Sequence, residues 1–194
     1  MKSSLELMRS GVWHHGITDE IGAALMKAEE MCFDFNSLRP SMTAERHAII
    51  NRLFGSIEEP YVLHSPFHCD FGSQIHIGHH FVGNYNLTIL DEGPVTIGNN
   101  VFIGPNSGIY TVTHALDPQQ RNEGIMRSLP VTIGNNVWIG AGVTILPGVT
   151  IGDNSVIGAG SVVTRSIPEW TLAAGNPCRP LRRITPADKI TCNF

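Results

Sequence analysis

The segment YTVTHALDPQQR, which begins at Tyr110, places His114 between two stretches of very regular sequence. An imidazole titrates near neutral pH, so a histidine held in a fixed position can serve as a general base. The surrounding residues, from about 111 to 129, are polar and contain Asp117-Pro118 and a glycine, which is typical of a loop. Long loops without secondary structure are usually functional or disordered. His114 is therefore a candidate catalytic base, with an ordinary surface histidine as the alternative.

The sequence on either side of this loop repeats every six residues. From Val131 it reads VTIGNN, VWIGAG, VTILPG, VTIGDN, SVIGAG and SVVTRS, and the same register holds from Val95 and more loosely from Ile75. This period fits neither an α-helix nor one long strand. It predicts a solenoid in which each six supplies a short strand and a turn, three sixes close a triangular coil, and stacked coils bury an Ile/Val column. Glycine or asparagine at the corners permits positive φ.

The first 58 residues have a different pattern. Apolar residues recur at helical spacing from Ile21 to Met31 and again from Ile49 to Ile57, with the segment FDFNSLRP between them. This spacing predicts two amphipathic helices that pack near the start of the solenoid. We expect a helical cap over residues 1–58, a solenoid over 59–184 with the inserted loop, and a C-terminal tail over 185–194.

Composition excludes several classes of function. The chain has 194 residues, a formal net charge of −4 and no long run of one sign, which disfavours nucleic acid as a partner. No apolar run is long enough to cross a membrane, and no secretory signal is visible. The cysteines lack the spacing of a disulfide framework or zinc finger, which favours a reduced, cytoplasmic protein. They are Cys32, Cys69, Cys178 and Cys192.

A metal site is one alternative for the histidines. Five of them crowd the region just before the loop: His64, His68, His76, His79 and His80. The gamma-class carbonic anhydrases are hexapeptide solenoids that bind zinc with three histidines, two of them in an H-x4-H arrangement. Gln119 stands five places after His114, so the second ligand of that pair is missing here. The segment HIGHH is then better explained as a polar outer face.

Longer motifs carry a more specific resemblance. They are FHCDFG from Phe67, GNYNLTILD from Gly83, TVTHALDPQQRNEG from Thr111, PVTIGNNVWIG from Pro130 and AAGNPCRPLRRI from Ala173. With the N-terminal MRSGVWHHGITDEI and FDFNSLRP, they resemble the sugar O-acetyltransferases, which include the maltose, galactoside and nodulation acetyltransferases. The resemblance implies a mainly β fold, a left-handed parallel β-helix with an α-helical cap. It also implies acetyl transfer from acetyl-CoA to a sugar hydroxyl without a metal, in a homotrimer with sites between subunits.

The same resemblance assigns roles to individual residues. His114 would be the base, and Asn84 would stabilise the transition state and contact the acceptor. The other acceptor contacts would be Asp70, Asp91 or Glu92, and Met126. Coenzyme A would contact Ala141, whose N–H faces the oxyanion, together with Ala159, Thr164, Arg165, Arg179, Arg182 and Trp138. The arginines suit its phosphates, because guanidinium groups bind phosphate through two hydrogen bonds.

Two positions depart from the family pattern, and a third distinguishes its branches. The family has an acceptor-contacting aspartate where Gly16 stands, with Asp19 nearby, and a common lysine where Arg165 stands. Asp70 stands where the galactoside branch has serine. Two other functions stay open: transfer to a non-sugar acceptor such as an antibiotic or serine, and a non-catalytic or carbonic-anhydrase-like trimer.

Overall fold

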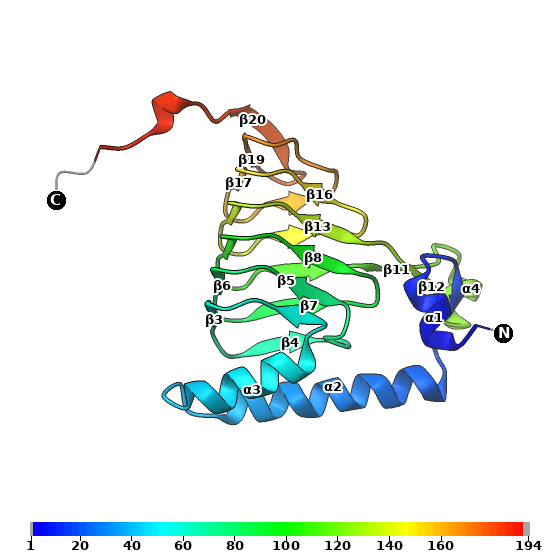
Figure 1. The fold of residues 1–194 in the computed structure, drawn as a ribbon. Helices are drawn as coiled ribbons and strands as arrows, with labels where there is room; N and C mark the ends of the chain where they lie inside the picture. The colour runs from blue at the N-terminus through cyan, green and yellow to red at the C-terminus, as the bar shows by residue number, and fades with distance from the viewer. Residues whose placement is uncertain (1, 192–194) are drawn as a thin grey trace.

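The computed structural model describes residues 2–191 and shows a triangular β-prism with helices across one end (Figure 1). This is the parallel β-helix that the six-residue repeat predicts. Within residues 2–191, no helix is both long and apolar enough to cross a bilayer. Cys192 and the end of the expected tail lie outside the described residues.

Three parallel sheets form the three faces of the prism, and each is named here after its first strand. The β2 face contains β2 (Ser56–Ile57), β5 (Ile75–Ile77), β8 (Val95–Ile97), β13 (Val131–Ile133) and β16 (Thr150–Ile151). The β3 face contains β3 (Tyr61–Leu63), β6 (Phe81–Gly83), β9 (Phe102–Ile103), β14 (Trp138–Ile139), β17 (Val156–Ile157), β19 (Thr171–Ala174) and the antiparallel β20 (Arg179–Arg183). The β4 face contains β4 (Phe67–Cys69), β7 (Leu87–Leu90), β10 (Gly108–Tyr110), β15 (Thr144–Ile145) and β18 (Val162–Val163).

The coils stack so that the same repeat position recurs on every level. On the β2 face, for example, Ile97 pairs with Ile133 in the next coil, and Ile133 pairs with Ile151. These side chains point inward and are almost fully buried, as are their counterparts on the other two faces. No single repeat could bury such a column alone, so stacking supplies the hydrophobic stabilisation of the fold.

The corners between β2-face and β3-face strands show how tight the stacking is. Asn100, Asn136 and Asn154 each adopt φ between 55° and 59°, as the turn requires. Their side chains form a ladder: the amide of Asn100 donates to Asn136 (3.1 Å), and that of Asn136 donates to Asn154 (2.9 Å). Asparagine therefore supplies both the left-handed backbone and the bond to the next coil.

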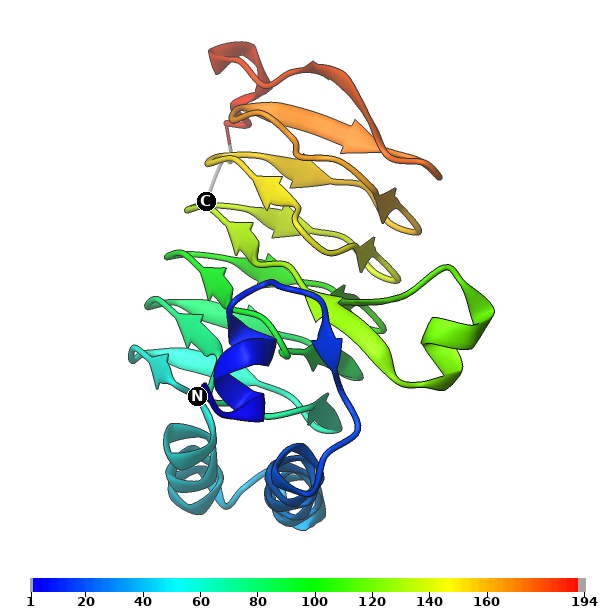
Figure 2. The same cartoon turned by 90° about the vertical axis from the view of Figure 1, so that its right-hand side faces the viewer.

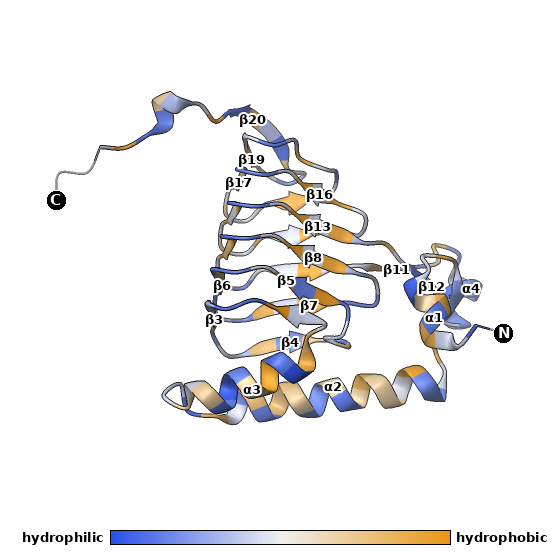
Figure 3. Cartoon of the chain, viewed as in Figure 1, coloured by the Kyte–Doolittle hydropathy of each residue, from blue (hydrophilic) through white to orange (hydrophobic). Residues whose placement is uncertain are grey.

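Helices α2 (Asp19–Ser37) and α3 (Thr43–Leu53) close the first end of the prism, as the apolar spacing predicts. The bands of α2 alternate between hydrophilic and hydrophobic colours in Figure 3. Asn36 pairs with the exposed edge of β4, because its side chain accepts from the Phe67 N–H (2.8 Å) and donates to the Phe67 carbonyl (2.9 Å). Arg46 is buried between α3 and the first coil, where it donates to the Phe35 and Leu63 carbonyls.

The structure corrects the expected bounds of the two helices. Most of FDFNSLRP is helical, because α2 continues to Ser37 and buries Phe35, leaving only a short turn before α3. Ile57, which was expected on the second helix, lies on β2, because its side chain continues the inward column beside Ile77.

The interrupting segment is a folded hairpin, so the expectation of an irregular loop is wrong. Strands β11 (Val112–His114) and β12 (Ile125–Ser128) pair antiparallel, and α4 (Pro118–Asn122) connects them, with Asp117 as its N-cap. The chain N-terminus completes this unit: β1 (His14–His15) pairs with β12, and α1 (Ser4–Arg9) packs beside them (Figure 2). Part of the expected helical cap thus belongs to the hairpin, which we call the hairpin sheet (β1, β12 and β11).

The C-terminal arm leaves the far end of the prism after β20 (Figure 1). A short 3₁₀ turn at Pro186–Asp188 follows, and Asp188 accepts two hydrogen bonds from Arg182, of 2.7 and 2.8 Å.

The asparagine ladder gives a stability prediction. We expect Asn136→Ala to destabilise the protein by about 2 kcal/mol or more, because it removes two ladder bonds and forces alanine into a left-handed conformation. Asn136→Gly loses the same bonds without the steric penalty, so about 1 kcal/mol of destabilisation is expected. Urea titrations at one protein concentration measure both, and equal losses for the two variants would show that backbone strain contributes nothing.

Candidate active site

His114 is the last residue of β11, which belongs to the hairpin sheet and lies outside the stacked coils (Figure 1). Its side chain is exposed, and it makes no hydrogen bond to another group in residues 2–191. Both ring nitrogens are thus accessible to a bound molecule. Pairing with β12, which in turn pairs with β1, keeps the backbone of His114 in place.

The root of the hairpin is fastened to the coil below it by Thr111. This residue is fully buried; its hydroxyl donates to the Leu90 carbonyl (2.6 Å) and accepts from the Gly93 N–H (2.9 Å). On the other side, the Ser128 hydroxyl donates to the Met8 carbonyl of α1 (2.6 Å). These buried bonds make the hairpin a rigid extension of the prism and not a mobile loop.

A second group of predicted residues lies along one edge of the prism, where β3-face strands turn into β4-face strands. Asn84, Ala141 and Ala159 occupy this edge, which we call the alanine corner. A Cβ on Gly104 would lie 2.6 Å from the Ala141 nitrogen, and one on Gly140 would lie 2.6 Å from the Ala159 nitrogen. The corner is therefore a narrow track lined by small residues.

The backbone of the alanine corner differs from that of the asparagine-rich corner in one respect that concerns chemistry. At the asparagine-rich corner, backbone N–H groups donate hydrogen bonds to side chains of the next coil. The Asn135 N–H donates to Asp153 (2.8 Å), and the Asn99 N–H donates to the Asn135 side chain (2.9 Å). Alanine offers no acceptor, and within residues 2–191 the Ala141 N–H donates to no protein group. Such an N–H is suited to a carbonyl oxygen or oxyanion of a bound molecule.

The third group lies where β4-face strands turn back to the β2 face, on the edge from which the hairpin leaves and one to two coils below it. Asp70, Asp91 and Glu92 meet here, and we call them the carboxylate corner. Asp91 is fully buried and accepts from the Phe71 N–H (2.8 Å) and the Gln74 N–H (3.2 Å). It therefore holds the loop that carries Asp70, which leaves Asp70 and Glu92 as the carboxyl groups available to an acceptor.

Burial changes the protonation of these groups. Burial, with a smaller contribution from the Asp91 charge, raises the pKa of Asp70 to about 6. Burial and then the charges of Asp70 and Asp91 raise the pKa of Glu92 to about 8. Glu92 Oε2 is buried without a hydrogen-bond partner in the described chain. At neutral pH Glu92 is thus mostly a neutral acid, able to donate a hydrogen bond as well as accept one.

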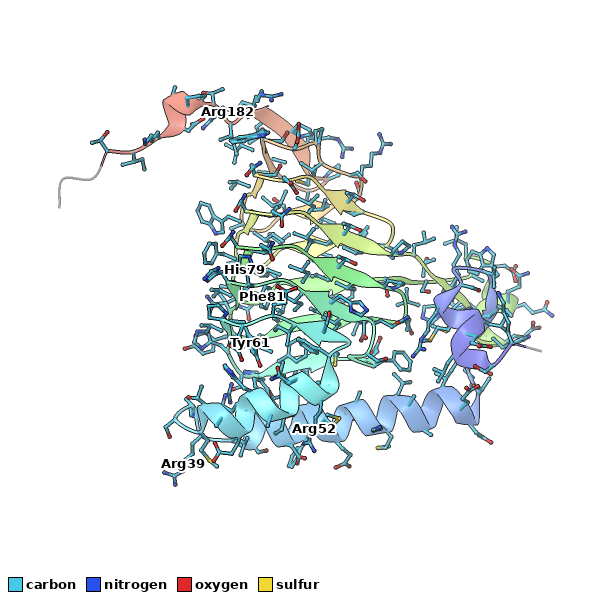
Figure 4. All side chains as sticks on the ribbon, viewed as in Figure 1. Arg39, Arg52, Tyr61, His79, Phe81 and Arg182 are labelled. Atoms are coloured by element: carbon cyan, nitrogen blue, oxygen red, sulfur yellow. The ribbon has the colours of Figure 1, made fainter. Side chains whose placement is uncertain are left out.

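The expected coenzyme A residues are spread along the upper half of the prism. Trp138 is 58% exposed on the outside of β14, and Thr164 and Arg165 are exposed after β18. Arg179 and Arg182 lie on β20; Arg179 donates to the Cys178 carbonyl, whereas Arg182 is engaged by Asp188. Figure 4 shows Arg182 at the end of the prism opposite α2 and α3. A contact between Arg182 and a phosphate of coenzyme A stays a prediction, and it requires Arg182 to release Asp188.

A single chain thus separates the predicted residues into two groups. The alanine corner lies on one edge of the β4 face, and the carboxylate corner with the hairpin lies on the other, as do Thr164 and Arg165, which follow β18. Sequence reasoning missed Thr111 and the buried His14 of β1. Asp117 followed by Pro118 is a typical start of a helix and could have revealed α4. Strand β1 has only two residues, which are too few to show an alternating apolar pattern.

Comparison with known proteins places this geometry in a family. The maltose acetyltransferase hexapeptide capping motif matches residues 7–58, and the bacterial transferase hexapeptide repeat matches residues 130–165. The galactoside O-acetyltransferase of Escherichia coli (strain K12) is 44% identical over 184 residues, covering 95% of this chain and 91% of that protein. The chain belongs to the maltose and galactoside acetyltransferase family. It is therefore an acetyltransferase with a hexapeptide-repeat fold.

Solved structures agree with this assignment. A maltose O-acetyltransferase from Clostridium difficile 630 is similar with a TM-score of 0.93 and 42% identity, covering 95% of this chain and 98% of the other. A galactoside acetyltransferase in complex with coenzyme A is similar with a TM-score of 0.92 and 42% identity, covering 97% and 94%.

The carboxylate corner gives a pH prediction. In the unfolded chain Glu92 ionises near its ordinary pKa of 4.5, whereas in the folded protein it stays protonated up to about pH 8. Between these values the folded state binds more protons, so this group makes stability fall as pH rises. We expect the melting temperature of Glu92→Gln, relative to wild type, to increase from pH 5 to pH 9. Glu30→Gln on exposed α2 is the control, and a Glu92→Gln difference that is constant with pH would contradict the prediction.

Proposed function

We propose that this protein transfers the acetyl group of acetyl-CoA to a hydroxyl of a sugar, with His114 as the general base. The observation that carries the proposal is the placement of an exposed histidine on a rigid hairpin sheet in a chain whose alanine corner offers a free N–H. The similar galactoside acetyltransferase that binds coenzyme A supports acetyl-CoA as the co-substrate here.

The reaction needs no acyl-enzyme. A ring nitrogen of His114 takes the proton of the acceptor hydroxyl while that oxygen attacks the thioester carbonyl carbon. The Ala141 N–H and the Asn84 side-chain amide stabilise the oxyanion, an interaction worth roughly 3 kcal/mol per donor. The C–S bond then breaks, and the proton passes from His114 to the departing thiolate. The acetyl ester and free coenzyme A are the products.

The acceptor binds beside the carboxylate corner. Sugar hydroxyls both donate and accept hydrogen bonds, and each needs a partner when water is removed. Asp70, which is charged above about pH 6, accepts such bonds, and the protonated Glu92 donates one. Coenzyme A lies along the alanine corner past Ala159, with Thr164 as a further contact and with the cations of Arg165, Arg179 and Arg182 facing its phosphates.

The complete site requires two chains. The alanine corner and the hairpin flank opposite edges of the β4 face, whose strands of about three residues span roughly 10 Å, and the hairpin points away from its own prism. Two large apolar side chains are exposed at the hairpin tip: Leu116 is 93% exposed and Trp13 is 49% exposed. Such a tip is suited to packing on a neighbouring copy next to that copy's alanine corner.

The outward side chains support one face as the interface with that copy. On the β2 face they are polar: Ser56, His76, Thr96, Thr132 and Thr150. On the β3 face the same outward position forms an unbroken apolar ladder: Val62, Val82, Phe102, Trp138, Val156 and Leu172. A large exposed apolar patch marks an interface. Because the β3 face adjoins the alanine corner, we propose a homotrimer in which each β3 face packs on the next chain.

The catalytic role of His114 is tested by substitution. We expect His114→Ala to lower kcat for acetyl transfer by about 10²- to 10⁴-fold, the contribution of a general base. Release of the coenzyme A thiol with a panel of sugars measures it. His76→Ala, which removes an exposed histidine from the β2 face, is the matched control. Turnover of His114→Ala at the wild-type rate would exclude the proposed base.

The assembly is tested on the two faces. Phe102→Glu places a charge within the apolar ladder, where burial without a partner costs several kcal/mol, so we expect dissociation to single chains and loss of acetyl transfer. Thr96→Glu makes a similar change on the polar β2 face and should leave the molar mass unchanged. Light scattering after size-exclusion chromatography measures both. A trimer that survives Phe102→Glu would show that the β3 face is not the interface.

A further inference from the structure

Met126 occupies the middle of the hairpin sheet. In the pairing of β11 with β12, Met126 lies directly opposite His114, and in the pairing of β12 with β1 it lies directly opposite His14. Directly opposed residues in antiparallel strands project to the same side of the sheet, with Cβ atoms about 4.5–5.5 Å apart. The half-buried Met126 is therefore the immediate cross-strand neighbour of the proposed base.

Gly16 makes room for this methionine. The Gly16 N–H donates to the Gly124 carbonyl (2.9 Å), which holds the backbone that follows β1 against the hairpin. A Cβ on Gly16 would lie 1.6 Å from Met126 Sδ and 2.8 Å from Met126 Cγ. Gly16 does not have a positive φ, so its backbone conformation does not itself require glycine. What the missing side chain provides is the space that the Met126 thioether fills.

The other side of Met126 is confined. His14 is 7% exposed, its Nδ1 lies 3.0 Å from the Val12 carbonyl oxygen, and its Nε2 is buried without a partner in the described part of the chain. A buried, tightly held imidazole leaves little freedom on that side. If a side chain at position 16 displaced the methionine, the free end of the thioether would have to move, and His114 is its other cross-strand neighbour.

We infer that Gly16 determines acceptor specificity by fixing the position of the Met126 side chain beside His114. This inference rests on the proposed function. The acceptor hydroxyl must lie within hydrogen-bond distance of the His114 ring, so the atoms next to that hydroxyl lie over the neighbouring residue, which is Met126. With no side chain at position 16, this side of the acceptor meets a thioether and no hydrogen-bonding group. Gly16 acts through Met126 and is a positioning residue.

The inference is tested with a double-mutant cycle. We expect Gly16→Ala to raise KM for the acceptor by about tenfold, the effect of misplacing a methylene-sized group in a binding site, and to change KM for acetyl-CoA by less than about twofold. In a Met126→Ala background, Gly16→Ala should change the acceptor KM by less than about twofold, because nothing remains to displace. Maltose and methyl galactoside are the acceptors assayed.

Gly22→Ala is the matched control. Gly22 lies on α2, and a Cβ there would meet nothing within 4 Å, so this substitution reports only the general effect of replacing a glycine in the N-terminal region. We expect its kinetics to match wild type, and the melting temperatures of both variants to show that they fold.

A second measurement is independent of activity. In protein labelled with ¹³C at the methionine methyl groups, Met126→Ala assigns the Met126 resonance, and Gly16→Ala should shift that resonance while Gly22→Ala does not. An unshifted Met126 resonance, or an equal acceptor effect of Gly16→Ala with and without Met126, overturns the inference and leaves the proposed function intact. Failure of the wild-type protein to acetylate any sugar overturns the proposed function and with it this role of Gly16.

Discussion

Stacking in register is the constraint on which the rest of this structure depends. The inward Ile and Val side chains must lie above one another to exclude water, so every other repeat position also lies above its counterpart in the next coil. A residue type that recurs at one corner position therefore forms a continuous line of like side chains along the prism. Asparagine produces a ladder of side-chain hydrogen bonds, and alanine produces a narrow track with a free N–H. The chemical character of each edge follows from the side chain that its corner position repeats.

The hairpin holds His114 at a distance from the prism that a residue of the stacked coils could not reach. A stacked coil presents backbone and short side chains at its surface, but it cannot hold an imidazole away from its own wall. The antiparallel pairing of β11 and β12 carries His114 outward, and Thr111 connects this pairing to the buried bonds of the coil below. The N-terminal segment adds β1 as a third strand, because a two-stranded hairpin by itself is only marginally stable in water.

In the carboxylate corner, Asp91 supports the backbone, whereas Asp70 and Glu92 are available to a bound molecule. Asp91 is buried with backbone N–H partners, which oppose the effect of burial on its pKa. Glu92 has no such partners, and burial together with two nearby carboxylates keeps its proton on at neutral pH. Burial raises the pKa of both carboxyl groups, and backbone donors oppose this effect at Asp91 alone.

The six-residue repeat by itself determined the solenoid, its triangular coil and the inward column. Every repeat places an aliphatic residue at the same position, so the pattern can be recognised within any short stretch of the sequence. The spacing of apolar residues likewise determined α2 and α3, and His114 was recognisable because it breaks the repeat. Only the tertiary structure decided that the loop is a hairpin, that β1 completes it, and that Asp91 supports a loop. It also placed Met126 over Gly16. These features depend on contacts between segments far apart in the chain, such as Met8 with Ser128, and no local pattern encodes a partner at that distance.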